Sequence, residues 1–289
     1  MNGWEVKWML DFPKLGFSEI LGEARLLGEY LRFRGDTLRE RASEISGDPR
    51  PVLLIPGFMA GDASLYPLGA RLRSDGHQVF YAGIWMNADC PAKTLERLSK
   101  RIHEVSLQTE LKVVIVGHSL GGLYARELAR RETALVEQVF LLGSPIKRAA
   151  GNTTPFLRPL VAAMRAIHRD CIEDGNNSCR NCGLNLPAGA PSVPEICIYS
   201  KTDGIVEWHS CLDEGPLVEC VEVDSSHCGI PLNLKTWDEI RTRLSRPAQP
   251  TRPLRVETQV TRMRALPPRT PHRSRASHHR LTRRNGTAA

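Results

Sequence analysis

The sequence has no long apolar run, and we expect no export leader. Its apolar stretches are far shorter than the about 20 residues that a membrane-spanning helix needs. The N-terminal stretch MNGWEVKWMLDFPK lacks a basic start followed by an apolar block and a small-residue cleavage site, so it predicts no secretory signal. We therefore expect a cytoplasmic protein with at most a weak contact to a membrane surface.

Acidic and aromatic side chains are almost missing from residues 246–289. This stretch holds 11 arginines and a single acid, Glu257, and no aromatic residue, although the whole chain has a net charge of only +7. Its richness in Pro, Arg, Ser and Thr is typical of a basic disordered tail. Because no aromatic rings stand between the arginines to stack on bases, we expect a solvated extension and no specific nucleic-acid partner. An electrostatic arm for nucleic acid or anionic lipid is the alternative.

Two patterns divide the rest of the chain. Residues 1–48 repeat apolar positions at intervals of three and four, which predicts an N-terminal helical segment. Across residues 49–245, short apolar runs alternate with amphipathic stretches, and this predicts an α/β fold with a mostly parallel central sheet flanked by helices. An insertion at about 146–194 interrupts the alternation and predicts a lid or binding element. The expected strands cover residues 52–55, 78–82, 113–116, 136–142, 196–200 and 218–223.

The stretch VVIVGHSLGGLYAR places Ser119 where an expected strand becomes an expected helix. A G-x-S-x-G sequence in this context predicts a nucleophile elbow, a tight turn that lifts the serine hydroxyl above the sheet. Gly117 and Gly121 supply the small neighbours that keep strand and helix from colliding. The start of the following helix favours negative charge that develops on the substrate.

A serine nucleophile needs a base and an acid that orients the base. Chain order and position after late strands predict Asp203, in YSKTDGIVEW, as the acid and His227, in VDSSHCGI, as the base. Asp224 is the alternative acid, because it lies three residues before the proposed base. His118 adjoins the nucleophile, but we expect its ring to point away and to pack.

The oxyanion of a tetrahedral intermediate needs two hydrogen-bond donors. One is expected to be the backbone N–H of Leu120, directly after the nucleophile. The other is expected from the glycine-containing loop IPGFMAG after the first strand, where the N–H of Phe58 is the first choice and that of Met59 the second.

These stretches, together with VLLIPGFMAGD and VFLLGSPIKRAAG, resemble the α/β-hydrolase superfamily, and within it bacterial triacylglycerol lipases and esterases. The resemblance implies a serine carboxylester hydrolase with a lid over an apolar acyl pocket, acting on small-molecule esters that are lipid-like or short-chain. An acyltransferase that uses the same triad, or a non-catalytic binding protein on the same fold, is the alternative. We expect no cofactor, and the sequence does not predict the oligomeric state.

Eight cysteines leave three alternatives open. Free buried thiols are expected first, since no export signal places the chain in an oxidising compartment. Disulfides come second, for example between Cys211 and Cys220 across a short hairpin. A structural zinc comes third, because Cys171, Cys179 and Cys182 form C-x7-C-x2-C, which has ligand-like spacing but lacks a second pair.

Overall fold

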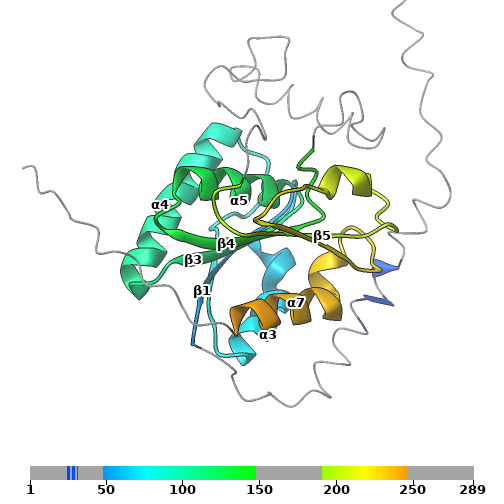
Figure 1. Ribbon diagram of the computed structural model, residues 1–289, viewed down its shortest axis with the longest axis horizontal. Helices are drawn as coiled ribbons and strands as arrows, with labels where there is room; N and C mark the ends of the chain where they lie inside the picture. Colours follow the sequence, from blue (N-terminus) through cyan, green and yellow to red (C-terminus); the bar gives the residue numbers. More distant parts are fainter. Residues whose placement is uncertain (1–24, 27, 30, 32–47, 148–190, 246–289) are drawn as a thin grey trace, which may run out of the picture. The chain divides into compact units, whose positions relative to one another are not determined.

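The structure is a computed structural model in which helices cover both faces of a central sheet (Figure 1). The expected lid insertion and basic tail lie largely or wholly outside the residues that it describes, and so does most of the expected N-terminal segment. Within that segment, residues 26, 28, 29 and 31 are helical. The described residues are 25–26, 28–29, 31, 48–147 and 191–245.

Six strands of the described chain form one sheet in the order β2-β1-β3-β4-β5-β6, and every neighbouring pair is parallel. The predicted α/β class is therefore confirmed. The inner strands are buried along almost their whole length because helices cover both faces of the sheet. The strands are β1 (Pro51–Ile55), β2 (Gln78–Tyr81), β3 (Val113–His118), β4 (Val136–Leu142), β5 (Glu195–Tyr199) and β6 (Val218–Glu222).

Figure 1 shows α4 (Pro91–Thr109) and α5 (Leu120–Arg131) over one face of the sheet and α3 (Tyr66–Ser74) and α7 (Leu234–Leu244) over the other. Each face carries its own apolar core. Helix α4 buries residues at intervals of three and four, which keeps one stripe of the helix on the sheet. No described helix is long and apolar enough to cross a membrane. Short 3-10 helices cover Asp62–Leu65, Trp208–Cys211 (η4) and Ile230–Leu232.

The parallel direction of the strands brings four loops to one edge of the sheet. β1 leads into the loop at residues 56–61 and β3 ends directly before Ser119, while Asp203 follows β5 and His227 follows β6. Ligands of open α/β sheets bind at this carboxyl edge. The candidate site therefore lies where these four loops meet.

Candidate active site

Ser119 occupies a strained turn between β3 and α5. Its backbone φ is 52° and its ψ is −117°, a combination that only a tightly constrained turn imposes on a residue with a side chain. The Ser119 N–H donates to the Leu142 carbonyl of β4 at 2.8 Å. A Cβ added at Gly117 would lie 2.4 Å from the Gly121 carbonyl oxygen, and one added at Gly121 would lie 2.2 Å from that of Ile55. Both glycines are therefore required for this approach of helix to strand.

Gly121→Ala is expected to lower the free energy of unfolding by about 1–3 kcal/mol, because the methyl group would press on the backbone of β1 and push α5 away from it. Displacement of α5 also moves Ser119, so we expect the variant to lose reactivity toward a fluorophosphonate probe. Denaturant unfolding and probe labelling measure the two effects. Gly28→Ala is the matched control, since among the described residues no atom outside its own helix backbone and its chain neighbours lies within 4 Å of its Cβ position. Equal stability of the two variants would contradict the packing argument.

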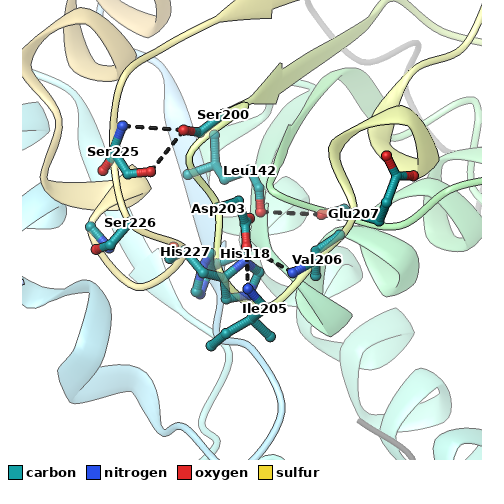
Figure 2. Close-up of polar contacts among 12 residues, drawn as sticks. His118, Leu142, Ser200, Asp203, Ile205, Val206, Glu207, Ser225, Ser226 and His227 are labelled. Carbon is teal, nitrogen blue, oxygen red and sulfur yellow. Dashed lines mark hydrogen bonds and ion pairs between the residues drawn. The ribbon is translucent and has the colours of Figure 1, made fainter. Parts of the chain in front are cut away.

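His227 and Asp203 form a buried acid–base pair. The His227 Nδ1 lies 2.7 Å from Asp203 Oδ2, and the two side chains are 4% and 2% exposed. Asp203 Oδ1 accepts hydrogen bonds from the N–H groups of Ile205 and Val206 at 2.8 and 2.7 Å (Figure 2). These bonds fix the carboxylate, and the carboxylate in turn favours the imidazole tautomer with its proton on Nδ1. The other ring nitrogen, Nε2, is then able to accept a proton.

The alternative acid has different partners. The Asp224 side chain is 72% exposed, and its carboxylate accepts hydrogen bonds from Arg25 at 3.2 Å and from Thr202 Oγ1 at 2.9 Å. Asp203 is thus the acid that the structure buries against the His227 ring.

His118 joins the elbow to the loop that carries His227. Its Nε2–H donates to the backbone carbonyl of His227 at 3.0 Å, and the two ring centroids lie 4.9 Å apart (Figure 2). Burial lowers the pKa of His118 to about 3, so the ring is neutral at pH 7. His118 directly precedes Ser119. The contact between His118 and His227 therefore holds the candidate base close to the turn that carries Ser119.

The loop after β1 lies against the elbow. A Cβ added at Gly57 would lie 3.2 Å from Ser119 Cβ. The Met59 N–H donates to the Asn87 carbonyl at 3.0 Å, so it is already occupied, and the Asn87 side chain donates to the Pro56 carbonyl at 2.8 Å. The Phe58 N–H makes no hydrogen bond to the described residues. Of the two predicted donors in this loop, Phe58 is thus the one whose amide makes no hydrogen bond within the described part of the chain.

The sequence matches one protein-family model. Residues 90–214 match the PGAP1-like alpha/beta domain. The matched stretch includes the elbow and the loop that holds Asp203. No curated protein matches the sequence.

Solved hydrolase structures share the fold. Lipase B of Aspergillus fumigatus superposes with a TM-score of 0.52 and is 21% identical, over 79% of this chain and 60% of the lipase chain. The chain has the α/β-hydrolase fold. A variant of the pyrethroid hydrolase PytH gives a TM-score of 0.50 at 15% identity, over 68% of this chain and 97% of the PytH chain. The aligned part thus spans about three fifths of the fungal lipase.

The described residues contain no group of three or more His, Cys, Asp or Glu side chains that could hold a metal ion. Cys171, Cys179 and Cys182 lie outside the described ranges. The zinc alternative for these three cysteines stays a prediction.

Two residues that sequence analysis did not predict hold the base loop in place. Ser200 Oγ donates to the Ser225 carbonyl at 2.7 Å and accepts from the Ser225 N–H at 3.2 Å, which joins the loops after β5 and β6 (Figure 2). The Glu29 carboxylate accepts from the Ser226 N–H at 2.8 Å, from Ser226 Oγ at 2.5 Å and from Ser225 Oγ at 3.2 Å. Neither residue belongs to a motif, so only the tertiary contacts show this role.

Glu29→Gln is expected to slow fluorophosphonate labelling of the nucleophile about tenfold, because an amide cannot accept all three hydrogen bonds from the buried serines and the His227 loop loosens. The labelling rate is measured at a temperature where both proteins are fully folded. Glu96→Gln is the matched control, since this exposed residue of α4 pairs with Lys100 on the same helix. Equal labelling rates for the Glu29 variant and the wild type would show that the contact does not position the base.

Proposed function

We propose that the chain is a serine carboxylester hydrolase that acts through an acyl-enzyme. The observation that carries this proposal is the buried hydrogen bond between His227 Nδ1 and Asp203 Oδ2, on loops that meet the strained elbow of Ser119. A strained serine, a histidine base whose Nδ1 faces a carboxylate, and a carboxylate that is itself fixed are the parts that nucleophilic acyl transfer requires.

In the proposed mechanism, Ser119 Oγ attacks the ester carbonyl while His227 Nε2 takes its proton. The carboxylate of Asp203 keeps the ring oriented and stabilises the imidazolium. The N–H groups of Phe58 and Leu120 bind the oxyanion. The Leu120 N–H suits this role because Leu120 is the first residue of α5. An N–H group in the first turn of a helix has no backbone acceptor in a preceding turn. The imidazolium protonates the leaving alcohol, and water then releases the acid by the same route.

Exposed apolar side chains beside the oxyanion loop support an apolar acyl group as substrate. Trp85 is 89% exposed, Met59 52% and Met86 43%. The hydrogen bonds between Met59 and Asn87 and between Asn87 and Ala60 hold the two loops that carry these side chains together. A cluster of exposed large apolar residues is typical of a binding surface. We therefore propose lipid-like esters as the substrate class.

A series of p-nitrophenyl esters from acetate to laurate tests the proposal. We expect hydrolysis with kcat/KM rising with acyl length, and labelling of the chain by a fluorophosphonate probe. A folded chain that cleaves none of the esters and takes up no probe would contradict the proposed activity. If kcat/KM fell as the acyl chain became longer, the proposed esterase activity would stand and only the proposed substrate class would be contradicted.

A further inference from the structure

Two cysteines lie side by side on the last two strands of the sheet. Cys197 of β5 and Cys220 of β6 are directly paired in the parallel register, and both are free thiols. Hydrogen-bonded strands lie about 4.8 Å apart. A disulfide requires Cα atoms about 4.4–6.8 Å apart. The backbone therefore already has a spacing that a disulfide can bridge.

Both side chains are on the same face of the sheet. Cys197 belongs to the apolar core beneath α4 and α5, and Val218 packs against that core. Side chains of a strand alternate between faces, so Cys220, two residues after Val218, is on the face of Cys197. The two thiols lie close enough for each to shift the pKa of the other. A disulfide between the two sulfur atoms would therefore not require either side chain to move to the other face of the sheet.

The two thiols differ in exposure and in acidity. Cys197 is 1% exposed, whereas Cys220 is exposed on β6 at the edge of the described sheet. The neighbouring Cys197 thiol lowers the pKa of Cys220 to about 6, and the Lys147 ammonium acts in the same direction. The interaction with Cys220 and burial raise the pKa of Cys197. At pH 7 the exposed sulfur is therefore largely thiolate, the form that reacts.

We propose that Cys220 and Cys197 form an oxidisable thiol pair for hydroperoxides, in which Cys220 is the attacking thiol and Cys197 the resolving thiol. The Cys220 thiolate attacks one peroxide oxygen, the O–O bond breaks, and the other oxygen leaves as water or an alcohol after protonation. This step gives Cys220 sulfenic acid. Cys197 then loses its proton and its sulfur attacks the sulfenic sulfur, the S–O bond breaks, and a water molecule leaves. The peroxide is reduced and the two thiols are oxidised to one disulfide.

The disulfide would join the two strands that lead into the loops of the candidate site. Asp203 follows β5, and His227 follows β6. The thiol chemistry itself involves neither residue, so the proposal stands independently of the proposed esterase activity.

Peptide mapping of the oxidised full chain tests the pair. The chain is reduced, freed of reductant, treated with one equivalent of hydrogen peroxide at pH 7 and blocked with N-ethylmaleimide. Cleavage after Lys, Arg and Glu then leaves Cys197 on residues 196–201 and Cys220 on residues 220–222, separate from every other cysteine. We expect these two peptides to be linked with the loss of two hydrogen atoms and to separate on treatment with dithiothreitol.

Three variants assign the roles of the two thiols. Cys220→Ser should abolish the linked peptide. Cys197→Ser should leave Cys220 as a sulfenic acid that the reagent dimedone traps, with much less trapping in the wild type. Cys211→Ser is the matched control, and it should form the same link as the wild type because that thiol is buried in η4. Absence of the link, attachment of Cys220 to a different cysteine, or equal trapping with and without Cys197 would overturn the proposal.

Discussion

Ser119→Ala is expected to lower kcat for ester hydrolysis by about 10⁶-fold, the size of effect that removal of a triad nucleophile has in serine hydrolases. The substitution removes the attacking oxygen and leaves the backbone, the His227–Asp203 hydrogen bond and the oxyanion donors in place. The fold should therefore be retained. The measurement is kcat on a p-nitrophenyl ester, together with the free energy of unfolding.

A second variant at the same position separates chemistry from strain. Ser119→Gly should be equally inactive, but it should be about 1 kcal/mol more stable than Ser119→Ala, because glycine adopts the φ of 52° without the cost that a Cβ imposes. Ser74→Ala, on the exposed side of α3, is the control for loss of a hydroxyl elsewhere. Ester cleavage at the wild-type rate by Ser119→Ala would show that the nucleophile is another group.

Asp203→Asn is expected to lower kcat by about 10⁴-fold with little change in stability. The amide oxygen can keep the hydrogen bonds from the Ile205 and Val206 N–H groups, so the loop geometry is conserved. The amide nitrogen then faces His227 Nδ1 and favours the tautomer with its proton on Nε2. A ring in that tautomer cannot accept the proton of the Ser119 hydroxyl.

Asp224→Asn is the matched control for the acid, because the sequence left both acids open. Its exposed carboxylate binds Arg25 and Thr202, so we expect kcat to change by less than about tenfold. Steady-state kinetics on both variants give the comparison. A larger loss of kcat in the Asp224 variant than in the Asp203 variant would reverse the assignment of the acid.

Local patterns were sufficient to predict the fold. The β-branched run at residues 113–116 and the G-x-S-x-G turn after it lie in β3 and in the turn before α5, because a buried strand and a tight glycine turn each have a local signature. The apolar pattern of α4 has its first buried leucine at Leu95, but the helix begins at Pro91, since proline at the first turn starts a helix without an apolar signal. The expected strands at residues 196–200 and 218–223 differ from β5 and β6 by one residue at their ends.

Contacts between distant segments could not be predicted in the same way. The sequence suggested a hairpin between Cys211 and Cys220, but Cys211 ends a 3-10 helix, and β6 pairs in parallel with β5 instead. That pairing brings Cys220 to Cys197, which only the strand order and register decide. The contact of Glu29 with the serines before His227 likewise joins residues almost 200 positions apart. Neither pairing leaves a local pattern in the chain.

The masses of the peptides during turnover show whether Ser119 carries the acyl group. The chain is mixed with a p-nitrophenyl ester, quenched in acid within the first turnovers, and mapped by peptide mass. We expect one acyl group attached to Ser119, and no adduct in Ser119→Ala. Turnover of the ester by the wild-type chain without an acyl group on Ser119, or with the acyl group on a different residue, would contradict the proposed acyl-enzyme.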